Sequence, residues 1–117
     1  MKKIYYLSTC DTCKRILQEI GPLDGFVLQD IKTDVITEAQ LNEMQKLSGS
    51  YESLFSKRAR LYKEKGLVDK TLSETDVKEL ILGHYTFLKR PVIIVDNAIY
   101  IGNSKKVVAA AKETIHP

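Results

Sequence analysis

The feature that most constrains the fold is a strand–helix–strand pattern at the N-terminus. An apolar run, Lys3 to Leu7, is followed by Asp11 to Ile20, in which apolar residues recur at helical spacing. Gly21-Pro22 is expected to end this helix, and a second strand is expected from Phe26 to about Ile31. Two strands joined through a helix pair in parallel, with a right-handed crossover in nearly all cases. The opening segment therefore predicts an α/β protein.

The middle of the chain, from about residue 37 to residue 85, is predicted to contain only helices. Thr37 and Gln40 form a capping-box pattern, and an apolar stripe follows them at helical spacing. Tyr51 to Lys65 is expected to be helical in one or two pieces. A further helix is expected to open at Ser73 and to carry His84 on its apolar face.

The C-terminal segment is predicted to form a β-hairpin and a last helix. Val92 to Val95 is wholly apolar, Asp96-Asn97 suits a two-residue turn, and Ala98 to Ile101 returns as the partner strand. A helix is expected after Ser104. The order β-α-β, helices, β-β-α predicts a four-stranded mixed sheet with helices packed against it. At 117 residues, a single domain with a helical insertion at about 37–85 is expected.

Composition and charge narrow the class of protein. The chain is 44% apolar and 28% charged, which is ordinary for a globular domain. No apolar run approaches the length that crosses a bilayer, and the basic start Met1 to Lys3 lacks the features of a secretory signal. The net charge of +3 does not by itself indicate nucleic-acid binding. A cytoplasmic location with no membrane and no direct nucleic-acid partner is expected.

The two cysteines of the chain, Cys10 and Cys13, form a C-x-x-C motif where the first strand gives way to the helix. Unpaired N–H groups and the positive end of the helix dipole meet there, which favours the reactive thiolate. Asp11 opposes the thiolate, whereas Lys14 and Arg15 favour it. We predict that Cys10 is a nucleophile and that Cys13 resolves its adduct. Cys13 also lies on the apolar stripe of the helix, so a structural role in the core stays open.

A zinc site is the main rival interpretation of a C-x-x-C motif. Structural zinc needs about four ligands. The remaining candidates are His84 and His116, and their separation fits no zinc-finger spacing. His84 suits a hydrogen-bonded core histidine better, and His116 is the penultimate residue. The sequence therefore predicts no metal.

Arg58 and Arg90 are candidate ligands for an anion. Arginine is permanently charged and can grip an oxyanion with a bidentate fork. Arg90 directly precedes Pro91 at a predicted strand start, where the peptide bond can be cis. The competing interpretation for both arginines is a solvated surface charge.

Several motifs together resemble the arsenate reductase ArsC/Spx family over nearly the whole chain. These motifs are Tyr6 to Arg15, Asp30 to Thr33, Leu54 to Arg58, and Lys89 to Ile94. The resemblance implies a thioredoxin-like α/β fold, a four-stranded mixed sheet with an all-helical insertion. It also implies a cis Arg90-Pro91 bond.

The resemblance further implies a chemistry. In arsenate reductases of this family a cysteine attacks arsenic, arginines hold the oxyanion, and glutathione with glutaredoxin completes the reduction. Here that implies Cys10 as the nucleophile and Arg58 and Arg90 as oxyanion ligands. The substrate would be a small oxyanion or a protein disulfide. No cofactor would be bound, and glutathione with glutaredoxin, or thioredoxin, would supply electrons. The implied substrate contacts are Thr9, Asp11, Thr12, Lys14 and Pro91.

Two departures keep a second function open. Gly102 or Asn103 stands where the authentic reductases have a third arginine. In addition, a C-x-x-C is typical of Spx-like transcription regulators, in which the pair is a disulfide switch and the protein binds the C-terminal domain of the RNA polymerase α-subunit. The sequence thus indicates an arsenate reductase-like thiol–disulfide oxidoreductase, with a redox-sensing regulator as the alternative. In that alternative, a surface including Ser50 to Arg60 would bind the polymerase.

Overall fold

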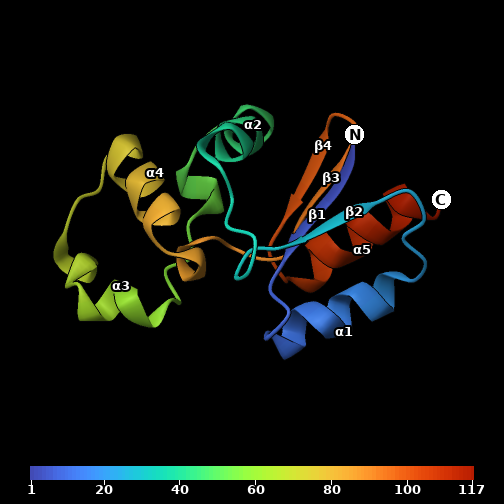
Figure 1. The fold of residues 1–117 in the computed structure, drawn as a ribbon, viewed down its shortest axis with the longest axis horizontal. Coiled ribbons are helices and arrows are strands. Elements are labelled where there is room, and N and C mark those ends of the chain that lie inside the picture. The colour runs from blue at the N-terminus through green and yellow to red at the C-terminus, as the bar shows by residue number, and fades with distance from the viewer. The chain divides into compact units, whose positions relative to one another are not determined.

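A computed structural model describes all residues, 1–117 (Figure 1). The chain forms two compact units. The sheet unit comprises Met1–Val35 and Arg90–Pro117, and the helical unit comprises Ile36–Lys89. No helix in either unit has both the length and the hydropathy needed to cross a bilayer.

The sheet unit is built on four strands. They are β1 (Lys2–Tyr6), β2 (Val27–Asp30), β3 (Val92–Val95) and β4 (Ala98–Ile101), in the order β2-β1-β3-β4. β1 and β2 are parallel, as the crossover through α1 (Asp11–Ile20) requires, and the other pairs are antiparallel. The predicted four-stranded mixed sheet is confirmed.

Two helices, α1 and α5 (Lys105–Ile115), lie side by side along the sheet in Figure 1. One apolar cluster joins them to the strands. Its buried members are Ile4, Ile16, Ile20, Ile93, Val108 and Ala111. Each buried isoleucine contributes about 1.5–3 kcal/mol of transfer free energy, so this cluster holds α1 against β1 and β3.

The hairpin forms as the sequence predicts. Val92 pairs with Ile101 and Val95 with Ala98, which leaves Asp96 and Asn97 as the two turn residues. Asp96 has φ 53°, a left-handed conformation that aspartate tolerates better than most residues. The chain therefore makes this turn without the glycine that such turns prefer.

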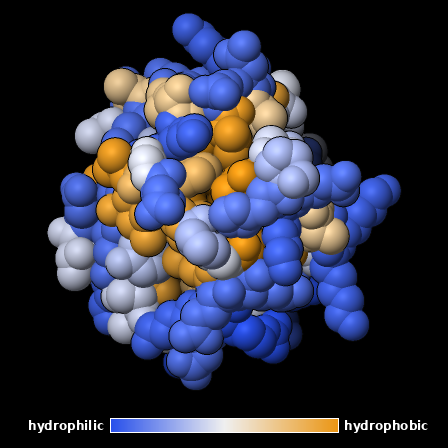
Figure 2. Space-filling view, turned by 90° about the vertical axis from the view of Figure 1, so that its right-hand side faces the viewer, coloured by the Kyte–Doolittle hydropathy of each residue, from blue (hydrophilic) through white to orange (hydrophobic).

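Figure 2 shows hydrophobic side chains gathered among hydrophilic ones on one face of the molecule. β2 is an outer strand of the sheet, and its first two side chains, Val27 and Leu28, are 59% and 43% exposed. The apolar surface of the sheet unit thus includes part of this edge.

The helical unit consists of three α-helices and three 3₁₀ turns. The α-helices are α2 (Glu38–Ser48), α3 (Arg60–Glu64) and α4 (Glu74–Gly83), and the turns are η1 (Glu52–Leu54), η2 (Leu67–Asp69) and η3 (Tyr85–Phe87). Complete capping boxes start α2 and α4, at Thr37 and Ser73. Phe55 and Phe87 stack in the core with ring centroids 5.5 Å apart.

One expectation in this unit is confirmed and one needs correction. Tyr51 to Lys65 is helical in two short pieces, η1 and α3, and the chain between them pairs with the segment around η3. Ser56 N donates to the Phe87 carbonyl at 2.7 Å, and Lys89 N donates to the Leu54 carbonyl at 2.8 Å. The prediction that His84 lies on a helix face is wrong: His84 follows the end of α4 and has an extended conformation. Its Nδ1 accepts a hydrogen bond from the Thr86 amide, which starts η3.

Candidate active site

Cys10 is the N-cap residue of α1. Its backbone is extended (φ −96°, ψ 110°), and its carbonyl accepts the first helical hydrogen bond, from Lys14 N at 3.2 Å. Cys10 N donates to the Leu7 carbonyl at 3.0 Å, which closes the turn between β1 and the helix. At the N-cap the Cys10 sulfur is placed beside the N–H groups of the first turn, among them the Cys13 amide. This is the position that the sequence predicts.

Cys13 lies one turn further on and is fully buried, whereas Cys10 is partly exposed. Ile16 and Ile20 follow Cys13 on the buried face of α1. The structural interpretation of Cys13 is confirmed, since it belongs to the core, and its resolving role beside Cys10 stays a prediction. Only Cys10 is accessible to a substrate.

The two thiols differ in acidity. Burial raises the pKa of Cys10, but hydrogen bonds from the Cys13 amide and thiol, and the charge of Arg90, outweigh burial and hold the pKa below its usual value. Burial, with the hydrogen bond to Cys10, raises the pKa of Cys13 to about 11. The Cys13 thiol, which its pKa of about 11 keeps protonated at neutral pH, donates to the Cys10 sulfur and so favours the Cys10 thiolate, the reactive form.

Arg90, two residues before β3, lies at the end of the sheet where β1 leads into the Cys10 loop. The antiparallel register pairs Tyr5 with Val92, so the start of β3 lies beside the exit of β1. The Arg90-Pro91 peptide bond is cis, as the resemblance implied. The Arg90 side chain hydrogen-bonds Cys10 and favours its thiolate electrostatically. The structure therefore brings Arg90, Pro91 and the cysteine pair together.

Asp30 anchors the loop that carries Cys10, a contact that the sequence analysis missed. Its carboxylate accepts hydrogen bonds from the Ser8 hydroxyl and from Ser8 N, the latter at 3.3 Å. Lys32 N also donates to it, at 3.2 Å. These bonds, led by that of the Ser8 hydroxyl, hold the pKa of Asp30 below its usual value. Asp30 ends β2, and since parallel strands end at one sheet edge, its position relative to the loop after β1 was a usable clue.

Gly102 and Asn103 are the positions where the resemblance leads us to expect a third arginine. Gly102 N donates to the Pro91 carbonyl at 3.0 Å, so this position follows β4 at the same end of the sheet as Arg90. Gly102 has φ +91°, a conformation that disfavours other residues. Asn103 is exposed. An arginine would therefore be easier to accommodate at Asn103 than at Gly102.

The other predicted contacts differ in their placement. Thr9 directly precedes Cys10, and Asp11, Thr12 and Lys14 occupy the first turns of α1. Arg58 belongs to the helical unit, in the exposed stretch between η1 and α3, and its role stays a prediction from the sequence. No group of three or more histidine, cysteine or acidic side chains is placed to hold a metal ion.

The fold and the site define a class of protein. A β2-β1-β3-β4 sheet, a cysteine at the start of α1 and a cis-proline just before β3 are the features of a thioredoxin-like fold. The model of the ArsC family matches residues 5–111, and the chain belongs to that family. No curated protein matches the sequence significantly.

Solved structures agree with this assignment. An arsenate reductase from Vibrio cholerae superposes with a TM-score of 0.73 at 20% identity, over 93% of this chain and 95% of that one. A Yersinia pestis protein provisionally described as an arsenate reductase has a TM-score of 0.75 at 16% identity, over 94% and 99%. A Staphylococcus aureus protein has a TM-score of 0.71 at 26% identity, over 94% and 97%. These likenesses establish the thioredoxin-like fold.

Proposed function

We propose that this protein is an arsenate reductase-like thiol–disulfide oxidoreductase with Cys10 as its nucleophile. The observation that carries the proposal is a partly exposed Cys10 whose thiol pKa is lowered, against the effect of burial, by hydrogen bonds from Cys13 and by the cationic Arg90. A thiolate beside a guanidinium can both attack an electrophilic centre and hold an oxyanion near it. The substrate is a small oxyanion or a protein disulfide.

For arsenate, the proposed first step forms a bond between Cys10 Sγ and arsenic. The thiolate attacks arsenic(V), and one arsenate oxygen leaves as water after protonation. Arg90 holds the remaining oxygens and balances their charge. The second step breaks the bond between Cys10 Sγ and arsenic. A second thiolate attacks Cys10 Sγ, the bonding pair moves to arsenic, and arsenite(III) leaves as a disulfide forms.

The second thiol is either Cys13 or an external thiol. Cys13 is close, but its pKa of about 11 leaves it protonated at neutral pH, which makes it a slow nucleophile. We therefore propose that an external thiol, glutathione with glutaredoxin or thioredoxin, resolves the adduct or reduces a Cys10–Cys13 disulfide. Either route regenerates the Cys10 thiolate with two electrons from the reductant.

The test is turnover by the full chain. Arsenate with glutathione and glutaredoxin is one arm, and a disulfide-bonded protein with thioredoxin is the other. Cys10→Ser removes the nucleophile and should abolish activity in both arms. Cys13→Ser, its matched control, should retain activity wherever the external thiol resolves the adduct. Lack of turnover in both arms would contradict the proposal.

A second candidate is an Spx-like redox regulator, favoured by the hydrogen bond that joins Cys13 to Cys10 within one turn of α1. A pair so placed can close into a disulfide, which a redox switch requires. Binding of the full chain to the C-terminal domain of the RNA polymerase α-subunit tests this candidate. Binding that changes with oxidation, and loses that response in Cys13→Ser, would support it. Absence of binding in both redox states would remove it.

A further inference from the structure

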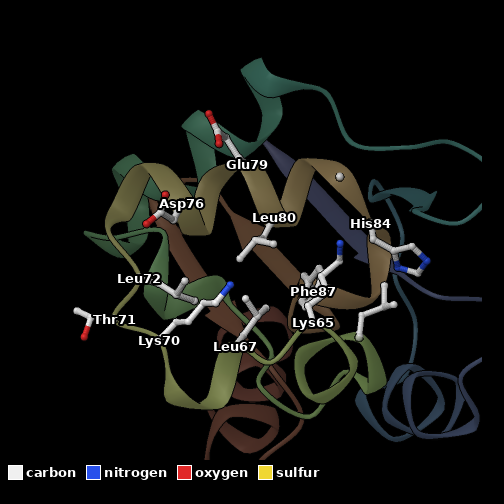
Figure 3. Close-up of a pocket in the computed structure, with 12 residues that line it drawn as sticks. Lys65, Leu67, Lys70, Thr71, Leu72, Asp76, Glu79, Leu80, His84 and Phe87 are labelled. Atoms are coloured by element: carbon white, nitrogen blue, oxygen red, sulfur yellow. The ribbon is translucent and has the colours of Figure 1, made fainter.

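The helical unit contains a cavity that the thiol chemistry does not use. The cavity has a volume of about 760 Å³ and is bounded by α3, η2, α4 and η3 (Figure 3). Ligand pockets typically measure about 300–1,000 Å³, with mostly apolar walls and a few polar groups that orient the ligand. The size of this cavity suits a small molecule. All of its lining residues lie within the helical unit, so it is a feature of that unit alone.

The floor of the cavity is apolar and firmly held. It is formed by Leu61, Leu67, Leu72, Leu80 and Phe87. Phe87 is buried and stacks on Phe55, which in turn contacts Tyr62 edge-on with centroids 5.8 Å apart. In Figure 3, Leu80 projects from α4 toward Leu67 and Leu72 on the other side of the cavity. Such a floor can bind an aliphatic chain by removing it from water.

The charged groups around the floor are not evenly disposed. Figure 3 shows the ammonium groups of Lys65 and Lys70 turned toward the cavity, whereas the carboxylate of Glu79 is turned away from it. Asp76 is engaged at the start of α4, where its carboxylate accepts a hydrogen bond from Ser73 N at 3.0 Å. The ion pairs of the structure involve Met1, Lys57 and Lys78, so neither cavity lysine is neutralised by a carboxylate. Asp76 and Glu79 also line the cavity, but the charged groups turned toward its interior are the two ammonium groups.

We propose that this cavity binds an aliphatic carboxylate of medium chain length. The chain lies on the leucine and phenylalanine floor, and the carboxylate accepts hydrogen bonds from Lys65 and Lys70. An aliphatic cation of the same length would meet like charges, and a short carboxylate would leave the apolar floor uncovered. The competing interpretation is that the two lysine stems merely cover the floor.

The test titrates decanoate, below its micelle-forming concentration, into the full chain and follows backbone amide NMR shifts. Saturable shifts at Leu67, Leu80 and Phe87 are expected. The double variant Lys65→Met, Lys70→Met keeps the apolar stems and should weaken binding about tenfold or more. Lys63→Met, in α3 but outside the lining, is the matched control and should bind as the original chain does.

Three results would overturn the proposal. The first is the absence of saturable shifts at the cavity amides. The second is equal decanoate affinity in the double variant, which would mean that the lysines only cover the floor. The third is equally tight binding of decyltrimethylammonium, which would show that charge plays no part. Cys10→Ser should leave decanoate binding intact, so failure of the thiol chemistry and failure of this site are separately visible.

Discussion

The Cys13 thiol donates a hydrogen bond to the Cys10 sulfur, and the pKa values of the two thiols, one turn apart, shift in opposite directions. Burial acts against ionisation of both thiols. At Cys10 it is overcome by the Cys13 amide, the Cys13 thiol and Arg90, whereas the pKa of Cys13 rises to about 11. The pair therefore works as one nucleophile and one donor, rather than as two equivalent thiols.

Replacing Cys13 should change the acidity of Cys10. Cys13→Ala removes the side-chain donor but keeps the amide, so we predict that the pKa of Cys10 rises. Cys13→Ser keeps a hydroxyl donor and should raise it less. The pH dependence of Cys10 alkylation by iodoacetamide measures both variants. An unchanged Cys10 profile in Cys13→Ala would show that the thiol hydrogen bond is unimportant.

Arg90 should matter for both charge and geometry. Arg90→Met removes the cation beside Cys10, and we predict a higher Cys10 pKa and a loss of about 100-fold in kcat/KM for an oxyanion substrate. Arg90→Lys retains the charge but not the planar fork, so the Cys10 pKa should stay closer to the original while turnover still falls. Equal loss of thiol acidity in both variants would contradict the charge of Arg90 as the cause, and full turnover by Arg90→Lys would contradict a specific role for the guanidinium.

Asp30 should give the fold an acid-sensitive contribution. Its pKa in the folded protein is lowered, chiefly by the Ser8 hydroxyl, from an ordinary value of 3.8. A lowered folded pKa means that the stabilisation is fully present above the unfolded value and is lost as pH falls through the folded one. Asp30→Asn should therefore melt at a lower temperature at pH 7, and the difference should shrink below pH about 4. Melting curves across pH test this, and a gap that does not narrow in acid would refute it.

The missing arginine suggests a gain-of-function variant. Asn103 is exposed and follows Gly102, whose amide bonds to Pro91 beside Arg90. We predict that Asn103→Arg adds a second cation at this end of the sheet and tightens arsenate binding several-fold, seen as a lower KM. Gly102→Arg is the comparison, and it should destabilise the protein because Gly102 has φ +91°. An unchanged KM in Asn103→Arg would show that this position does not face the substrate.

Local patterns accounted for the secondary structure that depends on local rules. The helix from Asp11 to Ile20, the capping boxes at Thr37 and Ser73, and the Asp96-Asn97 turn all follow from short-range periodicity, capping and turn chemistry. The prediction misplaced His84 because its spacing from the apolar residues of α4 continues the helical pattern, although the helix ends at Gly83. There, Nδ1 of His84 bonds the next turn and overrides the periodicity.

Some features of the candidate site were likewise predictable from local patterns, and others depend on the fold. Cys10 and Cys13 were visible because a motif and a helix start coincide in sequence, and Arg90 because it precedes Pro91. The anchoring of Ser8 by Asp30 joins residues 22 positions apart, and the directions of the two thiol pKa shifts depend on burial and hydrogen bonds. Of these, only the direction of the Cys10 shift was indicated locally, by the position of Cys10 at the helix start.

The most direct test of the central claim is the pKa of Cys10 itself. Iodoacetamide alkylation across pH, resolved for each cysteine by mass spectrometry, should be recorded for the native chain and for the same chain unfolded in urea. The account predicts that native Cys10 reacts with a midpoint below that of the unfolded chain, while native Cys13 is protected and titrates above it. A native Cys10 midpoint at or above the unfolded value, near 8.5, would contradict the account.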